Sequence, residues 1–403
     1  MSWPLVRLDE CARIVGGATP ATSNPAYWDG NINWVTPKDL SDLPGPYIAK
    51  TPRRITAAGL AACAAEVLPP NSVLFSSRAP IGHVAINVSP MATNQGFKSF
   101  VPDPRKVEAG YLYWWLRCHR SLMEGLGNGA TFKEVSKAVV SRVTIPLPPI
   151  EEQRRIIAIL HQAENLRRLR RASINRVEHL VSSIFAAHFS TRETPHQTVP
   201  LSELADIQIG HPFESSIYTN EPSGIRLCRG ANVLPGRLDW SDLARWPEDK
   251  AAPHSHLLLR SGDIIIAMDR PWISGGFKIA QVVPADIPAL LVQRVARVRA
   301  ASEDLGLFLY HSLRQPEFAR HCKPTETTVP HISPKEIRNY RISRPPMDKL
   351  KSFSAEVRAL AAYENIQVAQ MKRLDALFSS LQHRAFSGGF TVKAVQRELA
   401  EAG

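Results

Sequence analysis

The chain of 403 residues repeats its own pattern after about half its length, and this repeat restricts the possible fold more than any other feature. Pro4-Leu5 opens a stretch that is similar to the one opened by Pro200-Leu201, 196 positions later. Ile145 and Ile342 each precede a pair of prolines, and each pair is followed by a long helical pattern. The sequence therefore predicts the order globular unit, long helix, globular unit, long helix.

The proline pairs and one glycine pair give the expected limits of these segments. Proline is favoured at the start of a helix and glycine just beyond its end, and Gly388-Gly389 follows the second helical pattern. We expect the first globular domain at residues 1–149, the first long helix at 150–190, the second globular domain at 196–345, the second long helix at 346–388 and a C-terminal tail at 389–403.

The first helical pattern covers about residues 151–189. Glu151 and Glu152 stand at its start, where the helix dipole favours negative charge. Its apolar positions alternate at spacings of three and four, the 3.5-residue period of a coiled coil. The expected seam contains Ile156, Ile159, Ala163, Leu166, Arg170, Ser173, Val177, Leu180 and Ile184.

The second helical pattern covers about residues 347–386 and has the same period. Both seams turn polar near the middle, so we expect a buried polar pair there that fixes the register. The second seam contains Leu350, Phe353, Val357, Leu360, Glu364, Gln367, Met371, Leu374, Phe378, Leu381 and Ala385.

Neither helix can leave an apolar seam in water. The matching length and period favour lengthwise pairing of the two seams over the alternative, in which each helix packs on its own globular unit. A globular unit lies between them in the chain, so the pair is expected to be antiparallel. A helix of 39 residues is about 58 Å long. The pair would thus form a rigid bar that holds two similar heads apart.

Each head mixes short β-type runs with turn residues and one amphipathic helix. The fold class is therefore α/β (α+β), with an internal pseudo-twofold repeat of two globular domains separated by a long antiparallel coiled-coil pair. The expected strands include residues 34–35, 73–75, 84–86, 225–227, 264–266 and 278–280, and the expected helices include 111–118 and 305–314.

Polar side chains that can reach base edges or phosphates gather in corresponding loops of both heads. Arg pairs bidentately with guanine and Asn or Gln with adenine, whereas Lys, Ser and Thr more often hold phosphates. The candidates are Thr36, Lys38, Arg53, Arg54, Ser76, Ser77, Arg78, Asn94, Gln95, Asn128, Thr131 and Lys133 in the first head, and Arg229, Asn232, Arg237, Asp269, Arg270, Lys278, Gln293, Arg294, Thr327, Thr328 and His331 in the second.

The charge balance agrees with a polyanionic partner. The chain has 49 Lys and Arg against 37 Asp and Glu, a net charge of +12, which favours nucleic acid. The five cysteines are widely spaced and form no zinc or disulfide pattern, so we expect a reducing cytoplasm. No apolar run is long enough to cross a bilayer.

Motifs for chemistry are weak in this chain. A phosphate-binding G-x-x-x-x-G-K-[ST] loop does not occur. Residues 24–27 (NPAY) are similar to the catalytic tetrapeptide of adenine methyltransferases, but Ala26 replaces a proline and a surface turn is the better interpretation. Residues 248–250 (EDK) are similar to a nuclease motif, and His254 with His256 has no third metal ligand at a recognisable spacing. The sequence predicts neither a catalytic nor a metal site.

Five segments stand out in order along the chain: WVTPKDL at 34–40, FSSRAPIG at 75–82, residues 125–133, IPLPPIEEQRRI at 145–156 and LFSSLQHRAFSG at 377–388. Together they resemble a known family, the specificity subunits of type I restriction-modification systems, over nearly the whole chain. One departure is PPMDKL at 345–350, which lacks the Glu-Gln of the first junction.

The resemblance implies a DNA-reading, non-catalytic subunit. Each globular unit would be a target-recognition domain that reads one half of a bipartite site on double-stranded DNA. The helices would set the gap and dock two methylation (modification) subunits. No cofactor would bind here, because S-adenosylmethionine would sit on the methylation subunits and ATP on separate restriction (translocase) subunits. Two other functions stay open from the residues alone: a protein-binding adaptor, and an enzyme acting as a lone methyltransferase or nuclease.

Overall fold

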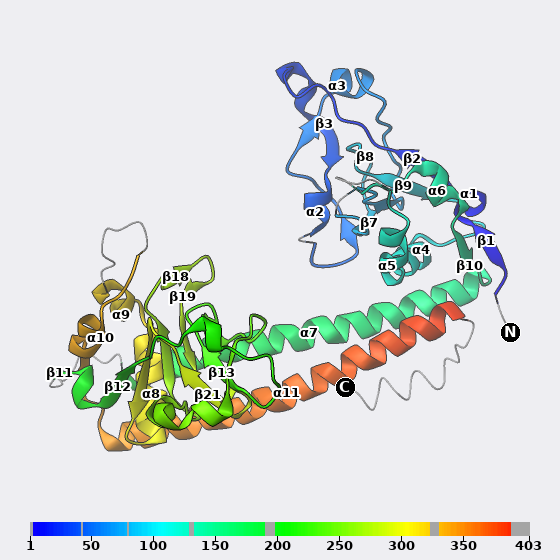
Figure 1. Cartoon of the computed structure of the whole chain (residues 1–403). Helices are drawn as coiled ribbons and strands as arrows, with labels where there is room; N and C mark the ends of the chain where they lie inside the picture. Colours follow the sequence, from blue (N-terminus) through cyan, green and yellow to red (C-terminus); the bar gives the residue numbers. More distant parts are fainter. Residues whose placement is uncertain are drawn as a thin grey trace. The chain divides into compact units, whose positions relative to one another are not determined.

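The computed structural model describes residues 3–41, 43–78, 80–128, 133–189, 198–322 and 330–387. The chain divides into two compact units (Figure 1), unit 1 with residues 1–173 and 367–403, and unit 2 with residues 174–366. The long helices α7 (Ile150–Phe189) and α11 (Met347–Ser387) each contribute one part to each unit. The bounds of α7 and α11 agree with the two helical patterns in the sequence. The division of the chain into five segments stays a prediction.

Unit 1 contains a five-stranded sheet of order β2-β9-β6-β7-β4, a three-stranded sheet of order β5-β3-β8 and the pair β1-β10. Its strands are β1 (Leu5–Arg7), β2 (Ala12–Gly16), β3 (Trp28–Val35), β4 (Tyr47–Ile48), β5 (Arg54–Ile55), β6 (Val73–Phe75), β7 (Val84–Asn87), β8 (Met91–Thr93), β9 (Lys98–Pro102) and β10 (Thr144–Pro146). Its shorter helices are α1 (Leu8–Cys11), α2 (Pro37–Ser41), α3 (Ala57–Ala61), α4 (Ala109–Cys118), α5 (Arg120–Gly125) and α6 (Lys137–Arg142), with the 3-10 turn η1 (Pro25–Tyr27).

Unit 2 contains a four-stranded sheet of order β12-β22-β17-β20, a three-stranded sheet of order β16-β13-β21 and the pair β11-β23. These strands are β11 (Thr198–Pro200), β12 (Ala205–Ile209), β13 (Ile225–Cys228), β16 (Arg245–Trp246), β17 (Ile264–Ala267), β20 (Ile279–Gln281), β21 (Ala289–Leu291), β22 (Val295–Ala300) and β23 (Arg341–Ser343). Two further pairs are β14 (Val233–Leu234) with β15 (Arg237–Leu238), and β18 (Trp272–Ile273) with β19 (Gly276–Phe277). Its helices are α8 (Glu303–Leu313), α9 (Pro316–His321) and α10 (Pro334–Asn339).

The two units share the order of their main strands, as an internal repeat would require. The order β2-β9-β6-β7 in unit 1 corresponds to β12-β22-β17-β20 in unit 2. Each three-stranded sheet contains one antiparallel pair, β3 with β5 or β13 with β16, and one parallel pair, β3 with β8 or β13 with β21. The antiparallel pairs β1-β10 and β11-β23 begin the two units in the same way, next to Pro4 and at Pro200.

The core of unit 1 joins the sheet, helix α4 and both long helices. Tyr111 and Trp114 of α4 are fully or almost fully buried. They lie in one apolar cluster with Ile156, Ile159, Leu160 and Ala163 of α7 and with Phe378, Leu381 and Ala385 of α11. In unit 2 the cluster around α8 contains Phe185 of α7 and Leu350, Phe353 and Val357 of α11. Each long helix therefore packs both on a globular core and on the other helix.

Within unit 1 the two long helices run antiparallel. Arg167 of α7 pairs with Asp375 of α11, and Arg170, further along α7, bonds to Gln367, earlier in α11. Gln367 is 6% exposed although it is polar. This Arg170–Gln367 pair is the polar contact expected at the middle of the seam. If an apolar residue faced Gln367 instead, its buried amide would lose this hydrogen bond.

The exposure of the seam residues follows the predicted period with one exception. The second-helix positions 350, 353, 357, 367, 371, 374, 378, 381 and 385 are all buried. In α7, Val177 is 3% exposed, but Leu180 is 50% exposed, so its assignment to the seam was wrong. Phe185 is buried and contacts Phe353 with ring centroids 5.7 Å apart. The apolar face has therefore moved by one residue around α7, because a straight α-helix drifts relative to a strict seven-residue repeat.

Among the described residues, no helix combines the length and apolar character that a membrane span requires. The two long helices are long enough, but each is amphipathic and rich in charge.

We expect Phe378→Ala to lower the free energy of unfolding by about 3–5 kcal/mol. The Phe378 ring lies 5.8 Å from the Trp114 ring, and the Arg167 guanidinium stacks on it at 4.3 Å, so truncation leaves a cavity in the helix pair. Leu180→Ala is the control and should change stability by no more than about 0.5 kcal/mol. Urea denaturation followed by circular dichroism measures both, and equal losses would contradict the assigned seam.

Candidate nucleic-acid interface

Corresponding strands of the two units end in the same capped turn. After β3, the Thr36 backbone N–H and hydroxyl donate to Oδ2 of Asp39, at 2.7 and 2.8 Å. After β13, the Arg229 backbone N–H donates to Oδ1 of Asn232 at 3.0 Å. A side chain three residues further on thus caps each turn, and Thr36 and Arg229 occupy equivalent positions.

Two further loops meet next to this turn through backbone hydrogen bonds. In unit 1 the Ser77 N–H donates to the Gly96 carbonyl at 2.8 Å, and the Asn94 N–H donates to the Val35 carbonyl at 3.0 Å. The equivalent bonds in unit 2 run from Met268 N–H to Arg294 O at 2.9 Å and from Val292 N–H to Cys228 O at 3.1 Å. The loops after β6 and β8, or β17 and β21, are therefore joined in the same way.

A fourth segment, just before α6 or α10, completes the arrangement. The Val135 N–H donates to Ser77 O, and the Ile332 N–H donates to Met268 O, each at 2.8 Å. We call these four converging segments the loop junction. It comprises residues 36–39, 76–78, 94–96 and 133–135 in unit 1, and residues 229–232, 268–270, 292–294 and 330–332 in unit 2.

The junction of unit 1 presents cations around one carboxylate. Glu134 pairs with Arg78 at 3.2 Å and with Lys98 at 3.1 Å. The Gln95 side chain is exposed and contacts the Thr19 hydroxyl. The surplus positive charge and the exposed amide are suited to an anionic, hydrogen-bonding partner.

The loop junction of unit 2 has the same pattern of backbone hydrogen bonds but different side chains. Asp269 pairs with Arg294, while the exposed side chains of Arg270 and Gln293 flank this pair. Arg270 and Arg294 have φ angles of +44° and +62°, which a non-glycine residue adopts at some energetic cost. Two exposed arginines therefore come from turns of this one loop junction.

Eleven of the predicted binding residues are exposed, and five more are half-buried. The half-buried ones are Thr36, Asn94, Arg229, Asp269 and His331. The exposed ones are Lys38, Arg53, Arg54, Arg78, Gln95, Asn128, Lys133, Arg237, Arg270, Gln293 and Arg294. Thr131, Thr327 and Thr328 lie outside the described residues.

Four predicted binding residues need correction, because their polar side chains are buried and already bonded. The Ser76 hydroxyl donates to Pro80 O at 2.7 Å, and the Ser77 hydroxyl donates to Gly96 O at 3.2 Å. Asn232 donates to Asp239 O and Asp242 O, both at 2.9 Å. Lys278 is 7% exposed and bonds to Gly230 O, and burial lowers the pKa of its ammonium group. We assign these four side chains to holding the loops in place.

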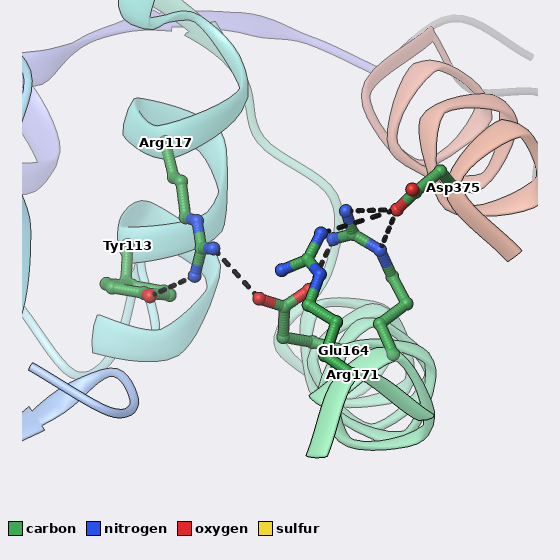
Figure 2. Close-up of polar contacts among 6 residues, drawn as sticks. Tyr113, Arg117, Glu164, Arg171 and Asp375 are labelled. Atoms are coloured by element: carbon green, nitrogen blue, oxygen red, sulfur yellow. Dashed lines mark hydrogen bonds and ion pairs between the residues drawn. The ribbon is translucent and has the colours of Figure 1, made fainter. Parts of the chain in front are cut away.

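Sequence reasoning missed a charged network between α4 and the long helices in unit 1 (Figure 2). Arg117 donates to the Tyr113 hydroxyl at 2.7 Å and to Glu164 of α7 at 2.9 Å. Asp375 of α11 accepts from Arg167 and lies 3.5 Å from Arg171. The network bonds the globular part to both helices. Only the run of basic residues at 167–171 gave any sign of it in the sequence.

A basic groove of about 1080 Å³ lies beside this network. Its walls combine apolar groups such as Leu43 and Trp114 with the arginines at positions 117, 120, 168 and 171. Glu164 is the acidic residue among its lining side chains in the described part of unit 1. The groove therefore adds a second region of positive potential to unit 1.

The weak catalytic motifs have structural roles. The Asn24 side chain accepts from the Ala26 N–H at 3.1 Å and caps the turn η1, which confirms the surface turn. Residues 248–250 form the 3-10 turn η4 (Glu248–Lys250). Over the described ranges, no group of three His, Cys, Asp or Glu side chains is placed to hold a metal ion.

Comparisons with known proteins point in one direction. A family model described as the type I restriction modification DNA specificity domain matches residues 2–179. The type I restriction enzyme MjaVIII specificity subunit of Methanocaldococcus jannaschii is 24% identical over 97% of this chain and 93% of its own length. The MjaIX specificity subunit of the same organism is 35% identical, but over 41% of this chain and only 38% of its own length.

A solved structure agrees with this fold. A chain from a study of complex assembly and conformational transition of the type I R-M system aligns with a TM-score of 0.61 and 21% identity. The alignment covers 96% of this chain and 98% of that chain. At this identity the likeness concerns the fold, and it extends over both units.

We expect Asn232→Ala to lower the free energy of unfolding by about 1–3 kcal/mol, because it removes three hydrogen bonds that the buried Asn232 side chain makes to the backbone of Arg229, Asp239 and Asp242. Asn128→Ala is the matched control, since this asparagine is exposed, and its effect should stay within about 0.5 kcal/mol. Chemical denaturation of both variants is the measurement. If the two asparagines are equally tolerant, the structural assignment of Asn232 fails.

Proposed function

We propose that the chain is a type I restriction-modification DNA specificity subunit and that it reads a bipartite DNA sequence, one half-site with each loop junction. The family match over residues 2–179 and the MjaVIII relative along nearly the whole chain support this assignment. The observation that carries this proposal is the repetition of the junction. Equivalent backbone hydrogen bonds hold four segments together in both units, while the exposed side chains differ between them. One scaffold with two side-chain sets is suited to reading two different short sequences.

The long helices would connect the two readings. In this proposal α7 and α11 pair along their seams and hold the two units at a fixed separation, so that both half-sites must be correctly spaced. Two weak contacts then act as one strong contact through effective concentration, and wrongly spaced half-sites are rejected. The contacts of Arg167 and Arg170 across the helices in unit 1, and of Phe185 in unit 2, support a continuous pair.

The chemistry would belong to other subunits. We propose that the chain is not itself an enzyme, that it docks two methylation subunits carrying S-adenosylmethionine, and that ATP-dependent restriction subunits join the same assembly. The amphipathic helices offer the docking surface, because apolar residues such as Leu169 and Ile366 are exposed on them at 54% and 56%.

We expect DNA affinity to fall steeply with salt. The target is found by mapping methylated adenines in the native genome, and filter binding with that duplex at two salt concentrations gives the slope. Each phosphate contact contributes about −0.9 to the slope of log K against log salt. A protein-binding adaptor would show weak affinity and little slope.

The purified chain with DNA, magnesium and S-adenosylmethionine should neither methylate nor cut, and either activity would favour the enzyme alternative.

We expect deletion of two heptads from the middle of both long helices to change the gap between the half-sites. Fourteen residues correspond to about 21 Å of helix. Each half-site should keep its bases, because the loop junctions are untouched. Methylation mapping of the variant, assembled with its methylation subunits, measures the gap. The wild-type chain is the control, and an unchanged gap would exclude the helices as the spacing element.

A further inference from the structure

A guanidinium group in unit 1 lies against two indole rings that contact each other. The Arg53 guanidinium lies 4.0 Å from the ring centroid of Trp28 and 5.0 Å from that of Trp34. The rings meet edge to face with centroids 5.1 Å apart and planes at 84°. Stacking on aromatic faces fixes both the position and the plane of an arginine side chain.

The two rings are themselves fixed. Trp34 is 2% exposed, and its indole N–H donates to Ala18 O at 3.1 Å. The Trp28 indole N–H donates to Ala21 O at 3.3 Å. Arg53 therefore rests on a rigid support, so little side-chain entropy would be lost when its N–H groups bind a partner.

The hydrogen-bonding edge of Arg53 is available. The side chain is exposed, and within the described part of the chain no carboxylate pairs with it. Its backbone carbonyl is used, because it accepts from Trp34 N–H at 3.2 Å and from the Thr51 hydroxyl at 2.6 Å. The backbone of Arg53 is thus anchored, while its exposed guanidinium has no carboxylate partner among the ion pairs of the described residues.

Unit 2 has a stacked arginine whose edge is occupied. Arg226 lies 4.8 Å from the ring centroid of Trp240, but its Nε donates to Pro288 O at 3.4 Å. The Trp240 indole N–H bonds to the Asp286 carboxylate at 2.8 Å, which places an acid beside this stack. Arg226 and Arg53 both stack on tryptophan, but of these two, over the residues that the structure describes, only the Arg226 guanidinium donates a hydrogen bond to the backbone. Stacking on tryptophan therefore does not by itself leave a guanidinium available.

The Arg53 stack adjoins the loop junction of unit 1. The Ala18 N–H donates to Thr93 O at 2.9 Å, and the Thr19 hydroxyl contacts the Gln95 side chain. Ala18 also accepts from the Trp34 indole, so one short segment touches both the stack and the junction. Arg53 therefore belongs to the same surface as the exposed junction residues.

We propose that Arg53 is a specificity-determining residue that reads one guanine of the half-site bound by unit 1. A phosphate contact needs only positive charge and tolerates a mobile side chain. A bidentate bond to guanine O6 and N7 needs a planar fork in a fixed orientation, which the two indoles supply. This inference rests on the proposed function, since it assumes that unit 1 faces the major groove.

The test maps methylated adenines produced by the full chain with its native methylation subunits in a host without adenine methylation. The variants are Arg53→Ala, Arg53→Lys and Trp28→Leu. The control is Arg105→Ala, which removes an arginine that is 87% exposed and paired with Asp103. Both Arg53 variants should lose roughly 10- to 100-fold preference at one guanine and keep every other base. Trp28→Leu should weaken the same position, and Arg105→Ala should leave the motif unchanged.

Other results would overturn the proposal. If Arg53→Lys restores the full motif, Arg53 supplies charge to a phosphate. If neither Arg53 variant changes the motif, or if both abolish methylation at every site while the assembly still forms, Arg53 does not read a base. A wild-type complex that methylates without sequence preference would instead refute the proposed function itself.

Discussion

The apolar seams of α7 and α11 are the constraint on which the rest of this structure depends. An amphipathic helix of about 40 residues cannot remain alone in water, and here each one buries its seam in two places. In unit 1 the end of α11 completes the core around α4, and in unit 2 the end of α7 completes the core around α8. Each globular core thus contains residues from both long helices, so neither repeat closes its core with its own residues alone.

Because residues of both long helices belong to the core of unit 1, a change in the helix pair also affects the globular part of that unit. A change in the helix pair alters the packing of Trp114 through Phe378, and it also alters the charged network of Glu164, Arg167 and Asp375. Arg117 extends that network into the globular part of unit 1. The globular part of unit 1 is therefore bonded to both long helices as well as packed on them.

The loop junctions have one backbone arrangement and two different sets of exposed side chains. Their geometry is set by backbone hydrogen bonds, such as Ser77 to Gly96 and Met268 to Arg294, and these bonds do not depend on which side chains project from the loops. Unit 1 places Arg78 and Lys98 around Glu134, whereas unit 2 pairs Arg294 with Asp269. The same backbone bonds therefore occur with two different sets of exposed side chains.

The sequence alone determined the repeat, the two helices and their seams, since each is a periodic pattern whose physical cause acts along a single element. It failed at Leu180, because the direction that a helix face takes is decided by what packs against it. It also could not separate exposed Arg270 from buried Asn232 and Lys278, because burial depends on which distant segments pack around each side chain. Only the tertiary structure brought Trp28, Trp34 and Arg53 into one stack, because such contacts depend on strand pairing between segments that sequence patterns treat as independent.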